Sequence, residues 1–294
     1  MGKNVWDMLL GFFAWCCAIL LAGSMILIIG FLILKGYKAI SLELIFANTS
    51  PLDALLFKQQ VFGGLFPAMV GTFFLILLSM GFALPLGLAS GIFLAEYAPG
   101  SIKKIFSLCF DILAGVPSIV IGLFGFSITI LLHHSFNSQI FPCLLISALS
   151  LAFLVLPYII KTTQVALESI PLLIRLTAPS LGATKLENIF LVLLPASISD
   201  ITSGIVLAIG RCAEDTAVIM LTGVVAVAGI PKSIFSGFEA LPFYIYYIAS
   251  EYSDQSELMK GYGAAIILLL ICSGLFGISH WGKNRLTAKT RFNY

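Results

Sequence analysis

Residues 65–95 read LFPAMVGTFFLILLSMGFALPLGLASGIFLA and contain no Asp, Glu, Lys or Arg. A helix of about 20 apolar residues crosses the roughly 30 Å hydrocarbon core of a bilayer, so this stretch predicts a membrane-spanning helix. The whole chain of 294 residues has the same character, with 60% hydrophobic and 10% charged residues. Soluble domains contain about 45–50% apolar and about 25% charged residues, which excludes a soluble enzyme and a disordered tail. The sequence therefore predicts an all-α membrane protein.

Apolar runs of this kind recur along the chain and predict six transmembrane helices. The first run is too long for the core of a signal peptide, and no A-x-A cleavage site follows it. Proline and glycine punctuate several runs, as at 115–117 (GVP), where the sequence leaves open an ordinary kink or a broken helix. The predicted spans cover residues 9–34, 65–95, 105–132, 140–160, 201–229 and 262–281.

The distribution of basic residues favours one orientation in the membrane. Ten of the 16 Lys and Arg residues lie in the segments on the side of both termini, which are 1–8, 96–104, 161–200 and 282–294. Five lie in the segments on the other side, and Arg211 lies within a span. Because Lys and Arg are enriched in cytoplasmic loops, we expect both termini in the cytoplasm.

The cysteine and histidine patterns predict no disulfide framework, no metal site and no cofactor. All six cysteines lie in apolar runs without a CxxC pair, where thiols act as small hydrophobic residues. The adjacent His133 and His134 have no third ligand nearby and fit a solvated turn. The chain has no GxxxxGKS/T phosphate loop, so we expect that it does not hydrolyse ATP by itself.

A group of charged residues interrupts the fifth predicted span. Glu214 and Asp215 lie three and four positions after Arg211, which brings both acids to the arginine's side of a helix. A charge in the hydrocarbon core costs at least about 2.5–3.5 kcal/mol, so these groups face protein or water rather than lipid. An arginine fork suits oxyanions, which makes the three residues candidates for a substrate pathway. The other interpretation is an internal ion pair that locks helix packing.

The net charge of this cluster is a difficulty for an anionic substrate. With Arg211, Glu214 and Asp215 all ionised, the cluster carries one excess negative charge and repels an anion. One acid is then protonated, neutralised by a partner chain or moved away during transport, and spacing does not tell which, because coupled acids titrate as a set. Asp111, near the start of the third predicted span, fits either a helix-end polar contact or a place on the pathway.

The segment 161–200 is too polar to span the membrane and too apolar to remain free in solution. It predicts two short helices, broken at Pro171 and Gly182, in which apolar residues mix with Glu168 and Arg175. A surface of this kind usually docks on a partner. The alternative is an amphipathic helix that lies on lipid.

The end of this segment carries a family resemblance. Residues 182–195 read GATKLENIFLVLLP, and their Gly-x9-Val-x-Leu-Pro spacing resembles the end of the EAA loop of ABC importer permeases. That loop inserts into a cleft of the ATPase subunit. Residues 176–178, which read LTA, replace the Glu-Ala-Ala start of the loop, so the glutamate contact with the ATPase is missing.

Two further stretches narrow the resemblance to the phosphate permeases of such importers. Residues 115–124 (GVPSIVIGLF) look like their third-span motif, and residues 210–217 (GRCAEDTA) are similar to their Gly-Arg-x-x-Gly-Glu-Thr pattern. On that alignment Arg211 matches the family arginine, Asp215 replaces the glutamate and Glu214 replaces the glycine. The six-span count favours the PstA type over the PstC type.

The resemblance implies a type I ABC importer permease fold and ATP-driven uptake of inorganic phosphate across a bacterial or archaeal plasma membrane. The implied organisation is a first helix and outer loop (1–64), a permease core (65–285) and a basic tail (286–294). The implied partners are a PstC-like second permease, a PstB-like ATPase dimer and a PstS-like phosphate-binding protein. The residues implied in coupling to the ATPase are Glu168, Arg175, Ala178, Gly182 and Ala183.

Rival functions remain open at this point. An ABC permease for another oxyanion, such as phosphonate, sulfate or molybdate, shares the loop. A proton-coupled secondary transporter uses intramembrane acids such as Glu214 and Asp215 as a relay. A membrane-embedded enzyme needs a nucleophile–base pair or a metal set, and the sequence offers neither. The aromatic-rich outer segment 230–261 fits either a contact with a binding protein or an aromatic belt in the headgroup layer.

Overall fold

The computed structural model describes residues 2–47, 49–56, 59–135 and 141–291 and is helical through most of them, which confirms the all-α prediction. Six runs within these residues are long and apolar enough to cross a membrane. They involve α1 (Gly2–Gly36), α4 (Phe66–Glu96), α6 (Ser118–Ser135), α7 (Leu144–Glu168), α10 (Leu194–Glu214) with the preceding α9 (Lys185–Asn188) and a π turn (Ile189–Leu193), and α13 (Gln255–Arg291). The shorter elements are a 3-10 turn (Tyr37–Ala39), α2 (Leu42–Phe46), α3 (Pro51–Leu55), α5 (Gly100–Ala114), α8 (Leu172–Ser180), α11 (Ala217–Thr222) and α12 (Leu241–Glu251).

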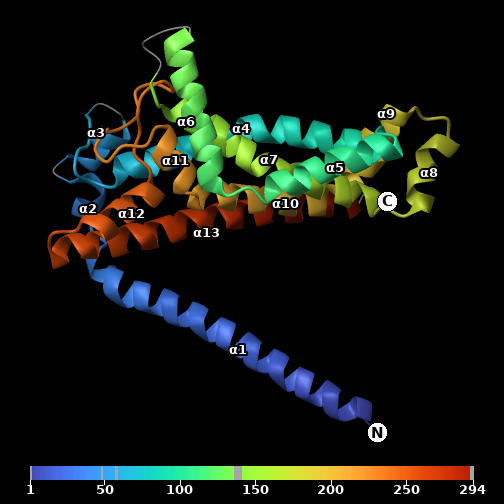
Figure 1. Ribbon diagram of the computed structural model, residues 1–294, viewed down its shortest axis with the longest axis horizontal. Coiled ribbons are helices and arrows are strands. Elements are labelled where there is room, and N and C mark those ends of the chain that lie inside the picture. The colour runs from blue at the N-terminus through green and yellow to red at the C-terminus, as the bar shows by residue number, and fades with distance from the viewer. Residues whose placement is uncertain (1, 48, 57–58, 136–140, 292–294) are drawn as a thin grey trace.

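The long helices form an elongated bundle with two distinct ends. In Figure 1, α8 and α9 lie at one end of the bundle, and α2, α3 and α12 lie at the other. We call these the α8–α9 end and the α12 end. Small residues bring the central helices close together: a side chain at Gly87 of α4 would collide with Ile159 of α7, and one at Gly91 with Thr163. The largest buried cluster joins α4, α6, α7, α10 and α11.

The third predicted span, 105–132, is wrong as a single helix. The chain divides at Gly115–Pro117 into α5 and α6, and only α6 is one of the candidate spans. Pro117 has no N–H for a helical hydrogen bond and disfavours a helical backbone at the residue before it, which explains the break. Figure 1 shows α6 turning sharply away from the direction of α5.

The fifth predicted span, 201–229, is also misplaced. One helical run covers Lys185–Glu214, and residues 215–229 hold α11 and part of a loop instead of the end of a span. The fourth predicted span ends at residue 160, whereas α7 continues to Glu168. Lys161, expected in a connecting segment, is therefore part of a long helix, where its ammonium group pairs with α5.

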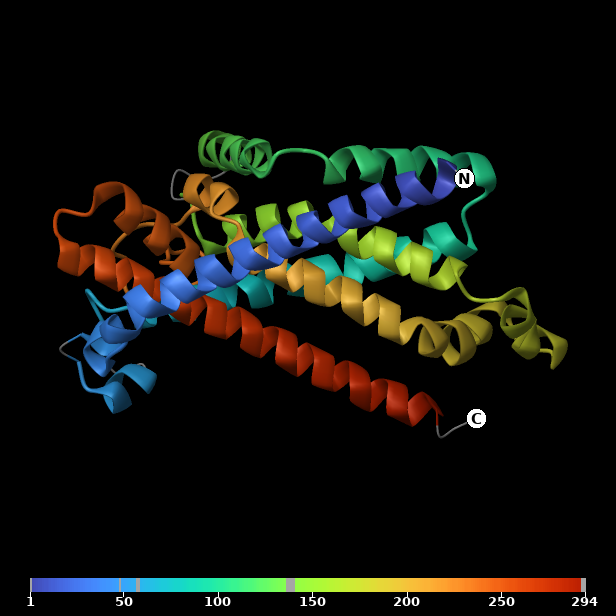
Figure 2. The same cartoon turned by 90° about the horizontal axis from the view of Figure 1, so that it is seen from below.

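The first helix stands apart from the bundle, as Figures 1 and 2 show. The apolar window of this span has no buried residue. The C-terminal part of α1 contacts α13: the ring centres of Phe31 and Tyr262 lie 5.9 Å apart, and a side chain added at Gly36 would meet Ile266 and the backbone of Tyr262. The Gly2 end of α1 and the Arg291 end of α13 both lie toward the α8–α9 end. So much exposed apolar surface is stable only against lipid or a partner subunit.

A buried carboxylate fastens the loop after α11. Glu239 is 6% exposed, and its Oε1 accepts hydrogen bonds from the N–H groups of Ala228 at 2.9 Å and Gly229 at 2.8 Å. Burial raises the pKa of Glu239 above its usual value, although both hydrogen bonds act in the opposite direction. The ionised carboxylate is thus disfavoured in the folded protein but holds two backbone donors that have no other partner nearby.

We expect Glu239→Gln to keep this loop folded and to remove its pH dependence, because an amide oxygen at the same position accepts both N–H groups. The raised pKa makes the charged form a cost to the folded state, which is present above the folded pKa and vanishes below the usual value. The thermal stability of Glu239→Gln relative to wild type is therefore highest near about pH 8 and falls toward about pH 4. Glu239→Ala leaves both donors bare and destabilises by about 1–3 kcal/mol for each.

Thermal unfolding of the purified complex at several pH values measures these differences. The exposed neighbour Glu251→Gln serves as the matched control and shifts little at any pH. Equal destabilisation by Glu239→Gln and Glu239→Ala would show that the loop depends on the charge rather than on the acceptor oxygen.

Candidate functional site

The charged cluster lies where α10 stops. The helix ends at Glu214, the backbone of Asp215 is extended with φ −73° and ψ 115°, and α11 begins at Ala217. Asp215 Oδ1 accepts a hydrogen bond of 2.9 Å from the N–H of Val218. Asp is a preferred residue for capping the start of a helix, so its carboxylate stabilises the first turn of α11. The side chain of Asp215 is 3% exposed, which fixes it in place.

The structure confirms that both acids reach Arg211. Glu214 Oε1 lies 3.1 Å from Nη1 of Arg211, and Asp215 Oδ2 lies 3.6 Å from Nη2. The two acids differ in exposure, since the side chain of Glu214 is 64% exposed and that of Asp215 only 3%. The Arg211 side chain is 39% exposed, and its buried Nε has no hydrogen-bond partner within the described residues. The guanidinium group therefore retains donor capacity.

The cluster lies beside the central part of the bundle. Cys212 and Ala213, next to Arg211, belong to the same buried cluster as Met80 and Ala83 in the middle of α4. The backbone of Gly210 packs on Phe276 of α13. A half-exposed arginine at this depth faces the side of the bundle that no described element covers.

Asp111, whose role the sequence left open, forms an ion pair with Lys161. Lys161 Nζ lies 3.0 Å from Oδ1 and 3.1 Å from Oδ2 of Asp111, which joins α7 to α5. Near the start of α5 and the end of α7, Lys103 Nζ lies 2.8 Å from Oε1 of Glu168. Glu168, expected in ATPase coupling, thus contacts α5 of its own chain.

The predicted break in the segment 161–200 is confirmed. α8 ends at Ser180, and Gly182 follows with φ +84°, a left-handed conformation that favours glycine. The N–H groups of Gly182 and Ala183 return to the carbonyls of Pro179 and Ala178 at 3.0 and 3.1 Å.

Arg175 points into its own chain. Its Nη1 forms an ion pair of 2.7 Å with Glu96 at the end of α4, and Nη2 and Nε donate to the carbonyls of Leu167 and Ile170. Glu96 is 9% exposed, so this is a largely buried pair. Sequence reasoning missed the role of Glu96, whose only signal was its place in a family-like stretch, residues 95–98 (AEYA).

Two more contacts hold this turn. Lys185 Nζ donates to the carbonyl of Glu96 and lies 4.5 Å from the ring centre of Tyr97. Asn188 donates to the carbonyl of Arg175 at 3.0 Å. Lys185 thus holds this segment against α4, Asn188 joins α9 to α8, and large apolar side chains of the segment remain exposed. Leu173 and Leu181 are 84% and 89% exposed.

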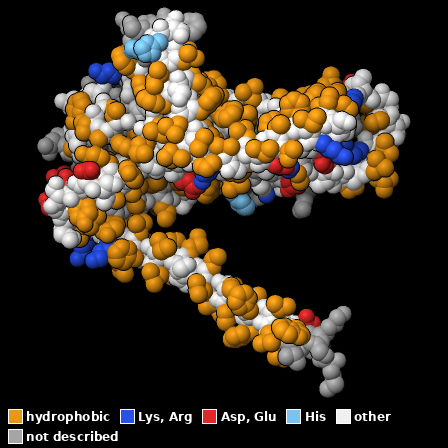
Figure 3. Space-filling view, in the orientation of Figure 1, with side chains coloured by type: hydrophobic (Ala, Val, Ile, Leu, Met, Phe, Trp, Pro, Cys, Tyr) orange, Lys and Arg blue, Asp and Glu red, His pale blue; other side chains and the backbone are white. Residues whose placement is uncertain are grey.

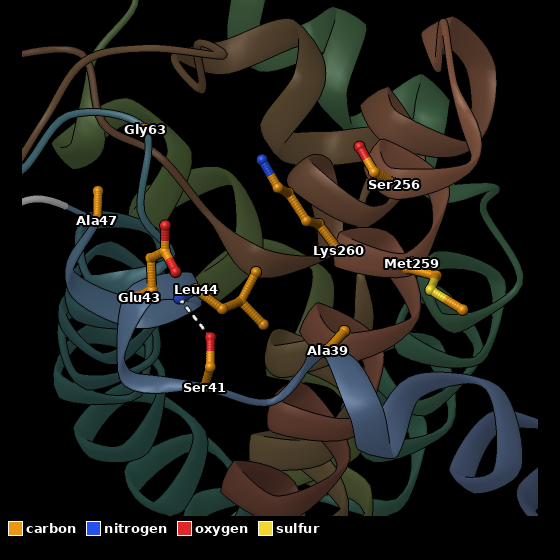
Figure 4. Close-up of a pocket in the computed structure, with 9 residues that line it drawn as sticks. All are labelled: Ala39, Ser41, Glu43, Leu44, Ala47, Gly63, Ser256, Met259 and Lys260. Carbon is orange, nitrogen blue, oxygen red and sulfur yellow. Dashed lines mark hydrogen bonds between the residues drawn. The ribbon is translucent and has the colours of Figure 1, made fainter.

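A cavity of about 410 Å³ opens at the α12 end, between the α2 region and the start of α13 (Figure 4). Figure 4 shows Glu43 and Lys260 on opposite sides of it. The hydroxyl oxygen of Ser41 accepts a hydrogen bond from the N–H of Leu44. The lining mixes polar and apolar residues and assembles no catalytic set. Among the described residues, no group of three His, Cys, Asp or Glu side chains is placed to hold a metal ion.

Six long apolar helices within the described residues, an arginine cluster where α10 ends and an exposed apolar turn at one end of the bundle are the features expected of a transport permease. The same fold occurs in a bacterial alginate ABC transporter solved in complex with a periplasmic protein that binds an alginate pentasaccharide. The match has a TM-score of 0.64 at 16% identity and covers 96% of this chain and 94% of that one.

Sequence comparison gives the family. Residues 87–281 match the family described as binding-protein-dependent transport system inner membrane component. The phosphate transport system permease protein PstA of Haemophilus influenzae is 30% identical over 94% of this chain and 90% of its own length. The PstA of Yersinia pestis is 33% identical over 83% of this chain and 78% of its own length.

The chain belongs to the family of binding-protein-dependent transport system inner membrane components, on its PstA branch. It is a multi-pass inner-membrane transport subunit and not itself an enzyme. Members of this family work with a separate ATPase, a substrate-binding protein and a second permease.

Proposed function

We propose that this chain is the permease of an ATP-driven importer of inorganic phosphate. The observation that carries the proposal is Arg211, a half-exposed arginine with spare donors in the middle of a bundle whose relatives are phosphate permeases. An arginine fork matches the several oxygens of a phosphate group. The translocation path then runs along the uncovered side of the bundle, against a PstC-like second permease.

The geometry supports different roles for the two acids. Asp215 is buried, caps α11 and pairs with the guanidinium group, so it stays in place. Glu214 is the acid that moves, because its exposed side chain leaves Arg211 without disturbing any buried group. When an anion takes its place, the cation and the fixed acid together carry no net charge.

The segment 161–200 is proposed to couple the permease to a PstB-like ATPase dimer. Exposed Leu173 and Leu181 supply the docking face, while Ala178, Gly182 and Ala183 shape the turn that presents them. Glu168 and Arg175 act through their pairs with α5 and α4 rather than by touching the ATPase. This end then faces the cytoplasm, together with both termini.

The α12 end is proposed to meet a PstS-like phosphate-binding protein, with segment 230–261 as part of the contact. The proposed organisation keeps residues 1–64 as first helix and outer loop, 65–285 as permease core and 286–294 as cytoplasmic tail. The exposed α1 supports a packing role against the partner permease or lipid, outside the core.

Uptake of radiolabelled phosphate by phosphate-starved cells that lack this chain tests the proposal. Wild-type chain, expressed with its partners, restores uptake, and unlabelled phosphate competes more strongly than sulfate, molybdate or phosphonate. Stronger competition by another of these anions assigns the permease to that anion instead. Uptake that follows a pH gradient without a working ATPase would replace the proposal with a proton-coupled transporter.

We expect Glu214→Gln to lower the apparent KM for phosphate by about two- to fivefold, because the competing carboxylate on Arg211 loses its charge. The matched variant Asp215→Asn lowers the amount of folded permease instead, since the cap is kept but Arg211 loses its buried ionic partner. Uptake by reconstituted complex, with the binding protein held at one concentration, gives the KM. A higher KM for Glu214→Gln would show that this acid helps to hold the substrate.

A further inference from the structure

Charged residues continue beyond Arg211 along one face of the bundle. Figure 3 shows blue and red side chains on the face that lies between α5 and α13. The ion pairs given above come from Lys161 with Asp111 and from Lys103 with Glu168, both between α7 and α5. Lys161 and Asp111 are 43% and 54% exposed, so they are reachable although Lys161 belongs to a spanning helix.

The depth of the Lys161–Asp111 pair follows from two independent contacts. A side chain at Gly204 of α10 would collide with Thr162, so Lys161 is level with Gly204. Arg211 lies seven residues further along α10, which is about 10 Å at 1.5 Å per residue. Measured along the axis of α10, the level of the pair is therefore about 10 Å from the level of Arg211, on the side of the α8–α9 end.

The second contact runs through α6. An added side chain at Gly122 would meet the backbone of Ala217 and Val218, which places the first turns of α6 beside the start of α11. Asp111 precedes the break between α5 and α6 by about one helical turn, so it lies on the side of the α8–α9 end. Both contacts place the pair on the same side of Arg211.

In three ion pairs on this face the carboxylate is the more exposed partner, whereas Asp215, the second acid on Arg211, is only 3% exposed. Glu214 and Arg211 are 64% and 39% exposed, and Asp111 and Lys161 are 54% and 43% exposed. Glu168 and Lys103 follow the same order at 36% and 32%. The pair of Arg175 and Glu96, which holds the coupling turn, has the opposite order, with the acid at 9%. Glu214 and Asp111 are thus free to swing away while their cations stay in place, whereas Glu168 also accepts a hydrogen bond of 2.8 Å from Gln164.

Lipid is an unsuitable neighbour for this face. A charge exposed to hydrocarbon is strongly disfavoured, so half-exposed Lys and Asp side chains on spanning segments face water or another protein. Val165, between Lys161 and Glu168 on α7, is 52% exposed, so the opening is continuous along the helix. A water-filled route lined by cations at successive depths suits a small oxyanion.

We propose that Lys161 is a second oxyanion-binding station of the permease, with Asp111 as its displaceable counter-ion. The inference rests on the proposed function and extends its pathway from Arg211 toward the α8–α9 end. An oxyanion that leaves Arg211 displaces the carboxylate of Asp111 from Lys161, and then meets Lys103 in the same way near the end of α7. Each carboxylate closes on its cation again after the anion has passed, so no station stays unpaired.

Chemical labelling tests this station without requiring transport. In the assembled complex, with the six native cysteines replaced, Asp111→Cys is treated with an anionic methanethiosulfonate in inside-out vesicles. The control is Ile112→Cys, the next residue on α5, which is 63% exposed and carries no ion pair in the native protein. We expect Asp111→Cys to react about tenfold faster than Ile112→Cys, and phosphate to slow only the former.

Two results would overturn the proposal that Lys161 binds the oxyanion. One is equal labelling rates at the two positions, and the other is fast labelling of Asp111→Cys that no oxyanion slows. Protection by another oxyanion in a permease that fails to transport phosphate keeps the station and rejects the phosphate assignment, so the two proposals fail separately.

Transport kinetics give a second measurement. Lys161→Gln is expected to lower the maximal uptake rate about tenfold, whereas Lys161→Arg retains most of it because the positive charge remains. Lys104→Gln, an exposed cation on the side of α5, is the matched control and leaves uptake unchanged. If Lys161→Gln shows wild-type uptake at normal membrane levels, the Lys161–Asp111 pair only joins α5 to α7 and does not bind the substrate.

Discussion

Phosphate uptake is expected to fall to background, at least about a hundredfold below wild type, when Arg211 is replaced by alanine. The change removes the cation that the anion needs and leaves Glu214 and Asp215 together with two uncompensated negative charges at mid-depth. Arg211→Lys keeps the charge but not the planar fork, so an intermediate loss of about tenfold is expected. Radiolabelled phosphate uptake in starved cells lacking the native chain measures both variants, with membrane levels determined in parallel.

A folding defect is separated from a transport defect by changing Asp215 at the same time. Asp215 is 3% exposed, and loss of Arg211 leaves its charge buried without a cation. Arg211→Ala with Asp215→Asn removes that charge, so the double variant regains membrane level without regaining uptake. Wild-type uptake by Arg211→Ala alone would make the arginine a structural element and would remove it from the pathway.

The sequence predicts the spans best where apolar character is uninterrupted. Residues 65–95 coincide with α4 to within a residue at each end, because no charged residue interrupts the run and the helix continues through Pro85. The third span was predicted as one helix because residues 105–132 stay apolar across Gly115–Pro117, and hydropathy does not register the loss of a backbone N–H at a proline. The helix is therefore interrupted at Gly115–Pro117 although the residues on both sides are equally apolar.

The predicted limits of the fifth span were wrong because polar residues occur within a continuous helix. The polar start of the helix, with Lys185 and Glu187, resembles a connecting segment in composition. In the structure Glu187 forms a capping box with Thr184, which is the local signal for a helix start at this point. Weighing that cap above hydropathy would have placed the helix correctly.

The candidate site was predictable only where its contacts are local. The pairs of Arg211 with residues three and four positions later follow from helix geometry, and the structure contains both. The pairs of Lys161 with Asp111 and of Arg175 with Glu96 join residues far apart in the chain. No periodicity within one helix determines such partners, since they depend on how the helices pack.

Arg175→Ala is expected to uncouple the permease from its ATPase. Glu96 is 9% exposed, and removal of its partner leaves a nearly buried charge, which costs about 3–5 kcal/mol. The carbonyls of Leu167 and Ile170 lose their guanidinium donors in the same step, so the turn that carries Leu173 comes free of α4. Phosphate uptake and co-purification of the ATPase with the permease should therefore fall together, by about tenfold or more.

The charge-reversed double variant Arg175→Glu with Glu96→Arg distinguishes an ion pair from a general loss of packing. It restores the pair but not the carbonyl contacts, so we expect it to recover part of the uptake that either single variant lacks. Thr177→Ala, exposed on the same helix, is the matched control and retains both uptake and ATPase binding. If Arg175→Ala keeps the ATPase bound and transports normally, the turn is held against α4 without the buried ion pair. The coupling force would then pass to α4 through Lys185 and through the apolar packing of Ile189 and Leu193 against Ile92 and Ala95.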